Sequence, residues 1–214
     1  DGQDKQRALS SLGYQWAQTD PQAAAAYART LPAGEMQNNL VNTLANQWAA
    51  TDSKAAIAWA NQLPEGEARN RALAGVVSGW AQNDPTGAAG FAAALPAGEA
   101  RDRAVASAVS QWARTEPDSA AAWVAGFGEG KLRENACRNL MSSWAENDPA
   151  AAGQWLQTLA AGAAREAAVQ TYVSHLSHSA PELAAPWAET LTDPNIRNSQ
   201  IENLARQWLR LDRA

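Results

Sequence analysis

Aromatic side chains recur along this chain at a fixed step of 32 residues, and this regularity constrains the fold more than any other feature of the sequence. One aromatic series is followed, 11 residues later in each copy, by a second. The first series is Trp16, Trp48, Trp80, Trp112, Trp144, Leu176 and Trp208, and the second is Tyr27, Trp59, Phe91, Trp123, Trp155 and Trp187. Self-similarity at such a period is typical of repeat architectures. The chain is therefore predicted to stack copies of one structural unit.

Each copy carries the signals of two consecutive helices. In the third copy, Asp84 precedes Pro85, a pair that suits the N-cap and first position of a helix. Apolar residues then follow at helical spacing over residues 85–95, and Pro96 and Gly98 end that helix. A second helix with its own apolar face is expected over residues 99–115. One copy therefore predicts a helical hairpin with short loops.

The sequence thus predicts an all-α solenoid of six two-helix repeats plus a leading helix, about thirteen helices in a single domain over residues 1–214. The leading helix is expected within residues 1–19, and the repeats begin near residues 20, 52, 84, 116, 148 and 180. The sixth repeat diverges, because Leu176 replaces tryptophan, Ala180 replaces the capping acid and Pro186 lies inside the first helix. Terminal repeats are commonly atypical, so we interpret the sixth as a cap.

Small polar and basic residues recur on the second helix of each repeat, on the side predicted to face solvent. One helix layer of a stacked array lines its inner surface, where such side chains could bind an extended peptide backbone. An ordinary soluble face is the alternative. The candidate partner-binding residues are Asn42, Asn46, Arg71, Ser78, Arg103, Ser110, Arg138, Ser142 and Ser174.

A further series places arginine in five repeats, and glutamine in the first, near the start of the second helix, where the helix dipole disfavours a cation. Its members are Gln37, Arg69, Arg101, Arg133, Arg165 and Arg197. We interpret the series as a latch onto the free carbonyls that end the preceding helix, or onto the face of an aromatic ring of the second series. A row of anion-binding arginines is the alternative.

The sequence predicts no catalytic, cofactor-binding or metal-binding residue. His175 and His178 share one helical face, but a zinc site requires three or four ligands. Cys137 occupies an apolar position of its helix, where it is expected in the core.

Charge and hydropathy bear on the class of partner. The net charge of −5 and the scattered lysines and arginines argue against nucleic-acid binding. The sequence contains no run of about 18 apolar residues, so it predicts no membrane-spanning helix. Because the chain begins at Asp1 without methionine, we expect either a removed leader or a piece of a longer protein, and we favour an exported or periplasmic location over a cytoplasmic one.

The run from Asp148-Pro149 through Ala152 to Trp155 resembles the junction between tetratricopeptide repeats. The period of 32 differs from about 34 in that family, and Leu-Pro-x-Gly-x-x-Arg stands in the turn, so the chain looks like a tetratricopeptide-like α-solenoid. It is also similar to Trp-Ala-x-x-Asp-Pro repeat regions of large, often exported bacterial proteins. This resemblance implies a right-handed superhelix that acts as a non-enzymatic scaffold and binds a protein or peptide on its concave face. The alternatives are an accessory domain of a larger enzyme and a structural spacer.

Overall fold

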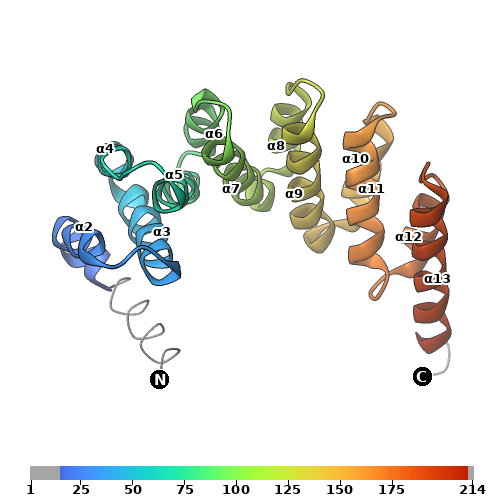
Figure 1. The fold of residues 1–214 in the computed structure, drawn as a ribbon. Helices are drawn as coiled ribbons and strands as arrows, with labels where there is room; N and C mark the ends of the chain where they lie inside the picture. Colours follow the sequence, from blue (N-terminus) through green and yellow to red (C-terminus); the bar gives the residue numbers. More distant parts are fainter. Residues whose placement is uncertain (1–14, 212–214) are drawn as a thin grey trace. The chain divides into compact units, whose positions relative to one another are not determined.

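The structure is a computed structural model that describes residues 15–211, and over this range the protein is all-α, with no strand (Figure 1). Residues 15–19 are helical, and the rest of the predicted leading helix lies outside the described residues. The chain divides into two compact units, residues 1–112 and 113–214, and each is described by itself.

Short and long helices alternate in both units. The first unit contains α2 (Pro21–Thr30), α3 (Glu35–Thr51), α4 (Ser53–Asn61), α5 (Glu67–Trp80), α6 (Pro85–Ala94) and most of α7 (Glu99–Thr115). The second unit contains the end of α7, then α8 (Pro117–Ala125), α9 (Lys131–Asn147), α10 (Pro149–Thr158), α11 (Ala163–Leu176), α12 (Pro181–Ala188) and α13 (Pro194–Leu211). The even-numbered helices begin one residue after the predicted repeat starts, so each hairpin pairs a short even-numbered helix with a long odd-numbered one.

Side-chain caps start most of the even-numbered helices. Asp20, Asp52, Asp84 and Asp148 each accept a hydrogen bond from the backbone N–H three residues later, at 2.8–3.0 Å. Glu116 occupies the same repeat position, but the prediction that it caps its helix is wrong. Its side chain makes no capping hydrogen bond to α8. The extra methylene of glutamate places the carboxylate farther from the first-turn N–H groups than that of aspartate.

The turn between the two helices of a hairpin depends on glycine. Gly34, Gly66, Gly98, Gly130 and Gly162 have φ between 138° and 158°, a region that other residues rarely adopt. The turn of the sixth hairpin differs, because Pro194 occupies the position of the glycine. Asp193 Oδ1 there accepts hydrogen bonds from the backbone N–H groups of Asn195 and Ile196 at 2.8 and 3.2 Å. An Asp-Pro pair therefore starts α13, as it starts α2, α6 and α10.

The two aromatic series meet at the repeat boundaries. Ring centroids lie 5.5 Å apart for Trp16 and Tyr27, 6.0 Å for Trp48 and Trp59, 6.1 Å for Trp80 and Phe91, and 5.9 Å for Trp144 and Trp155. An alanine three residues before each second-series ring is buried, which leaves room for neighbouring helices to approach. These alanines are Ala24, Ala56, Ala88, Ala120, Ala152 and Ala184.

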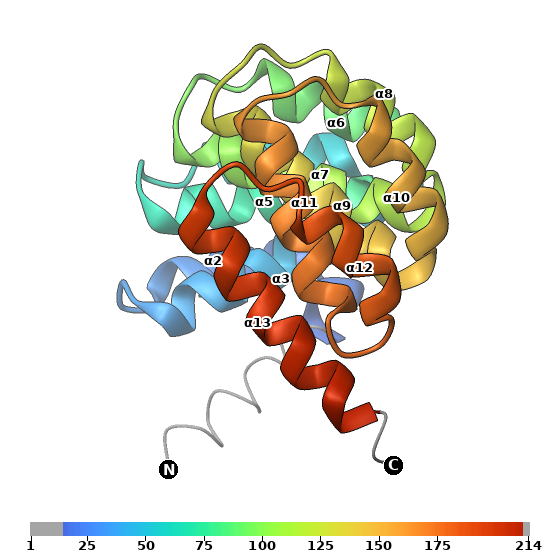
Figure 2. The same ribbon diagram turned by 90° about the vertical axis from the view of Figure 1, so that its right-hand side faces the viewer.

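The odd-numbered helices pack on one another inside each unit. In the first unit α3 packs against α5, and in the second α9 packs against α11. The even-numbered helices contact the odd-numbered helices before and after them, as α4 contacts α3 and α5, and α12 contacts α11 and α13. Figure 2 shows α10 and α12 lying to one side of α11 and α13. Within a unit, the odd-numbered helices therefore have one side that contacts the even-numbered helices and an opposite side that does not.

Helices α3 and α5 meet backbone to backbone. A Cβ built on Gly79 would lie 2.0 Å from the carbonyl oxygen of Asn46, and one built on Gly75 would lie 2.5 Å from that of Asn42. The side-chain amide of Asn42 also donates to the carbonyl of Arg71 at 3.0 Å. Only glycine fits at these two positions of α5.

The sixth repeat replaces its missing tryptophan from another position. Tyr172, one helical turn before Leu176, lies edge-on to Trp187 with ring centroids 6.2 Å apart. Its hydroxyl donates to the carbonyl of Pro149 at 2.9 Å, which ties α11 to the start of α10. Pro186 lies within α12, which at 8 residues is shorter than the other even-numbered helices, as its position predicts.

Substitution of Gly79 by alanine is expected to destabilise the fold by about 1–3 kcal/mol, because the added methyl overlaps the Asn46 carbonyl and the α3–α5 pair must separate. The matched control is Gly90→Ala on α6, where no atom lies within 4 Å of the new Cβ. Gly90→Ala should instead stabilise the fold, by up to about 1 kcal/mol, through its higher helix propensity. Urea unfolding monitored by circular dichroism measures both, and a neutral Gly79→Ala would contradict the close contact.

The cap at Asp84 is expected to contribute about 1 kcal/mol to stability, so Asp84→Ala should lower the free energy of unfolding by this amount. Asp84→Asn keeps an oxygen acceptor for the Gly87 N–H and should retain most of the stability. Thermal unfolding of the two variants separates loss of the acceptor from loss of the charge. Equal destabilisation by both substitutions would show that charge rather than the hydrogen bond matters.

Candidate partner-binding surface

All nine candidate residues lie on odd-numbered helices. Seven of them are partly buried, whereas Arg138 and Ser174 are exposed. The first unit carries Asn42 and Asn46 on α3, Arg71 and Ser78 on α5, and Arg103 and Ser110 on α7, and the second unit carries Arg138 and Ser142 on α9 and Ser174 on α11. Each unit therefore has its own stretch of polar side chains.

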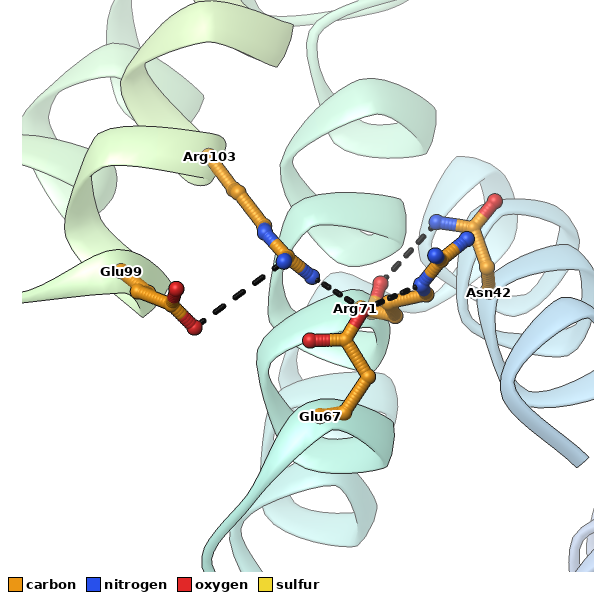
Figure 3. Close-up of polar contacts among 5 residues, drawn as sticks. All are labelled: Asn42, Glu67, Arg71, Glu99 and Arg103. Carbon is orange, nitrogen blue, oxygen red and sulfur yellow. Dashed lines mark hydrogen bonds and ion pairs between the residues drawn. The ribbon is translucent and has the colours of Figure 1, made fainter. Parts of the chain in front are cut away.

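A group of charged residues joins three of these candidates in the first unit. Glu67 accepts hydrogen bonds from Arg71 Nε at 2.7 Å and from Arg103 Nη1 at 2.6 Å, so one carboxylate bridges α5 and α7. Glu99 lies 3.9 Å from Arg103 Nη2, and Asn42 reaches the backbone of Arg71 from α3. We call these five residues the Glu67 cluster, and Figure 3 shows them on three neighbouring helices.

The Glu67 cluster is electrically balanced. The hydrogen bonds from Arg103 and Arg71 hold the pKa of Glu67 at about 2, well below its ordinary value, and Glu67 in turn raises the pKa of the Arg103 guanidinium. Two guanidinium groups face two carboxylates, so the cluster is not a purely basic patch. A guanidinium has five N–H donors, more than these contacts use.

Sequence reasoning missed Glu67 and Glu99 as members of this surface. A signal was present, because glutamate occupies the same place in the first three repeats, at Glu35, Glu67 and Glu99. The bond from Arg103 to Glu67 spans 36 residues, which is one period plus one helical turn. The rotation of neighbouring helices decides whether such a pair meets, and the period alone does not supply it.

Serine candidates take part in bridges between successive odd-numbered helices. Ser78 accepts from Gln111 Nε2 at 3.0 Å in the first unit, and Ser142 lies 2.9 Å from His175 Nε2 in the second. Both pairs are 33 residues apart, so the same two repeat positions meet each time. Ser174 accepts from Gln200 at 3.3 Å. These serines support the packing of helices as well as lining the polar side.

Three of the six members of the series from Gln37 to Arg197 make a contact that its position predicts, whereas Arg101 instead lies 3.6 Å from the carboxylate of Asp102. Gln37 donates to the carbonyls of Ala28 and Leu31, and Arg197 donates to that of Leu191, so both cap the preceding helix. Arg165 lies over the ring of Trp187 in the next repeat, 5.7 Å from its centroid. Other members bond to side chains in the same hairpin, Arg69 to Asn61 and Arg133 to Glu129.

The two histidines have separate partners. His175 faces Ser142, and His178 Nδ1 lies 3.0 Å from the hydroxyl of Ser177. Within residues 15–211, no three His, Cys, Asp or Glu side chains form a group that could hold a metal ion. Cys137 is buried in the core, and its burial raises the thiol pKa to about 11, so the thiol stays protonated at neutral pH.

A groove of about 500 Å³ lies beside the Glu67 cluster in the first unit. It runs between the turn after α2 and the turn after α4, and Glu67 forms part of its wall. Leu31, Gly34, Gln37, Leu63 and Pro64 are among its other lining residues. Apolar side chains and the polar edge of the cluster thus meet in one concave feature.

Comparison with protein-family models, with characterised proteins and with solved structures gives no match for this chain. In the described part of the chain, no helix is both long enough and apolar enough to cross a bilayer.

Replacement of Glu67 by glutamine should alter the response of stability to acid. The folded-state pKa of Glu67, about 2, lies below the ordinary 4.5, so the ionised carboxylate stabilises the fold above pH 4.5. This contribution is lost as the pH falls from 4.5 toward 2. The parent chain should therefore have the higher melting temperature at neutral pH, and its advantage over Glu67→Gln should vanish at the acid end.

The same pair of proteins provides the salt control. Added salt screens partly exposed ion pairs, so the difference in melting temperature should also shrink at high ionic strength. A difference that is independent of both pH and salt would contradict the ion-pair origin of the stabilisation.

Proposed function

We propose that this chain is a right-handed, tetratricopeptide-like α-solenoid that binds a protein or an extended peptide along the polar side of its odd-numbered helices and has no catalytic activity of its own. The observation that carries the proposal is the Glu67 cluster, in which a carboxylate holds two partly exposed guanidinium groups on successive helices. Side chains held in this way lose less conformational freedom when a partner binds.

The chemistry of the polar side suits a peptide backbone. Arginine, asparagine and glutamine side chains supply N–H donors for carbonyl oxygens, and the serine hydroxyls can donate or accept. In the first unit Asn42, Arg71 and Arg103 come from three consecutive odd-numbered helices, so their donors form a row across the helix axes. An extended segment crossing the helices would meet these donors in succession.

The adjoining groove offers apolar contact. Leu31, Leu63 and Pro64 line it, and Glu67 links it to the cluster. Ligand sites commonly combine an apolar surface with a few polar groups that fix orientation. The groove and the cluster together provide this combination.

The residues with perturbed pKa values have structural explanations. Glu67 bridges two guanidinium groups, and Cys137 and Tyr172 are shifted by burial. Their shifts accompany packing and ion pairing rather than a reactive centre, which favours a binding role.

The proposal is tested with peptides chosen by the protein itself. A random dodecapeptide library is selected on the immobilised full chain, and the affinity of a selected peptide is measured by fluorescence anisotropy. The double substitution Arg71→Gln and Arg103→Gln should weaken binding by about tenfold or more, because both anchoring groups are removed. Glu67→Gln keeps both guanidinium groups but removes the charge that holds them in place, so it should weaken binding by a smaller factor than the double substitution.

A control on the opposite side of the hairpins completes the experiment. Lys54 is an exposed basic residue of α4 that lines neither the groove nor the cluster, so Lys54→Gln changes the even-numbered layer and should leave affinity unchanged. Equal affinity for the Arg71/Arg103 double variant, or amide shift changes confined to even-numbered helices on peptide binding, would overturn the proposal.

A further inference from the structure

One side of α13 exposes apolar residues at positions that are mostly buried in earlier repeats. The exposed fractions of Ile201, Trp208 and Leu209 are 39%, 49% and 61%, and Ala205 is also exposed. We call these four residues the α13 face. Leu204, which borders this face on the helix surface, is buried, so α13 itself is packed against the rest of its unit.

Most of the corresponding residues of earlier repeats are buried, although Trp16 is 36% exposed and Trp80 is only partly buried. Positions 32 residues apart are equivalent, so each residue of the α13 face has a counterpart in every preceding odd-numbered helix. The buried counterparts are Val41, Ala45, Trp48 and Ala49 on α3, Cys137, Met141, Trp144 and Ala145 on α9, and Val169, Val173, Leu176 and Ser177 at the end of α11.

The following hairpin supplies the cover in each case. Trp48 contacts Trp59 of α4, and Ala45 lies beneath α5, where a Cβ on Gly75 would be 3.1 Å from it. Trp144 contacts Trp155 of α10, while α9 packs along α11. In these earlier repeats, the surface equivalent to the α13 face is therefore covered by the helical hairpin of the next repeat.

We propose that the α13 face is a docking site for a helical hairpin of this repeat class carried by a partner protein. The first helix of that hairpin would place an aromatic ring on Trp208, with an alanine three residues before it, and the second would lie along Ile201 and Ala205. This inference is independent of the peptide-binding role of the polar side.

The even-numbered helix beside α13 adds a charge requirement. In the first unit, Gln22 and Arg29 of α2 line the groove toward α4, and Arg29 bonds to Gln62. The equivalent residues are the exposed acids Glu182 of α12 and Glu189, which directly follows that helix. A docked hairpin is therefore expected to carry an N–H donor at the position of Gln62, where it would meet Glu189.

The test presents such a hairpin at high local concentration. A second copy of residues 53–84, which includes Trp59 and Gln62, is attached to the C-terminus of the full chain through a flexible glycine-serine linker. A tether of this kind gives an effective concentration of about a millimolar. Amide hydrogen exchange over residues 197–209 should slow by about tenfold or more relative to the untethered chain, because docking suppresses local opening of α13.

Two substitutions in the tethered protein define specificity. Trp208→Asp should abolish the protection, because it places a charge at the centre of the contact. Leu183→Asp is the matched control, since Leu183 is an exposed leucine of α12 whose equivalent, Ala55, faces the preceding repeat, and it should leave the protection unchanged.

Three results would overturn the proposal. The first is exchange that is unaffected by the tethered hairpin, and the second is protection that survives Trp208→Asp. The third is found by sedimentation of the untethered chain: a dimer that Trp208→Asp dissociates would show that a second copy of the chain, and not a partner's hairpin, covers the face.

Discussion

Contact between the last ring of one hairpin and the first ring of the next is the interaction on which this structure depends. Trp48 lies in the last turn of α3 and Trp59 in the last turn of α4, and their contact fixes the angle at which the chain enters the new repeat. The aspartate between them, Asp52, caps the same helix. A buried alanine, Ala56, lets the indoles lie between helices without forcing them apart. Packing, capping and chain direction are thus set together at one junction.

Departures from the repeat show which parts of this junction can be replaced. Loss of the tryptophan at Leu176 is offset by Tyr172, which reaches Trp187 from one turn earlier and adds a hydrogen bond to Pro149. Loss of the turn glycine at Pro194 is offset by the Asp193 cap of α13. In this repeat an aromatic ring still contacts Trp187, but Tyr172 supplies it in place of the residue at position 176. The contact is conserved between copies of the repeat more strictly than the position.

The period was sufficient to predict what depends on neighbours in the chain. It placed the starts of the short helices, the aspartate caps and the glycine turns, because each is decided by residues within one hairpin. It was wrong about the cap at Glu116, where side-chain length matters, and it did not anticipate Tyr172. The polar surface was predicted as a row of positions but not as a set of contacts. Glu67 with Arg103, and Ser142 with His175, are bonded across helices, and such bonds depend on helix rotation and separation.

The glycines of α5 have a mechanical consequence for the first unit. Where helices meet through side chains, a small displacement is absorbed by rotamer changes. Gly79 and Gly75 instead place the backbone of α5 directly against the carbonyls of α3, and sliding would drive main-chain atoms over one another. The α3–α5 pair therefore behaves as a stiff element under load. A shift of α5 along α3 cannot be taken up by side-chain rotamers at Gly75 and Gly79, so the two helices are expected to move together.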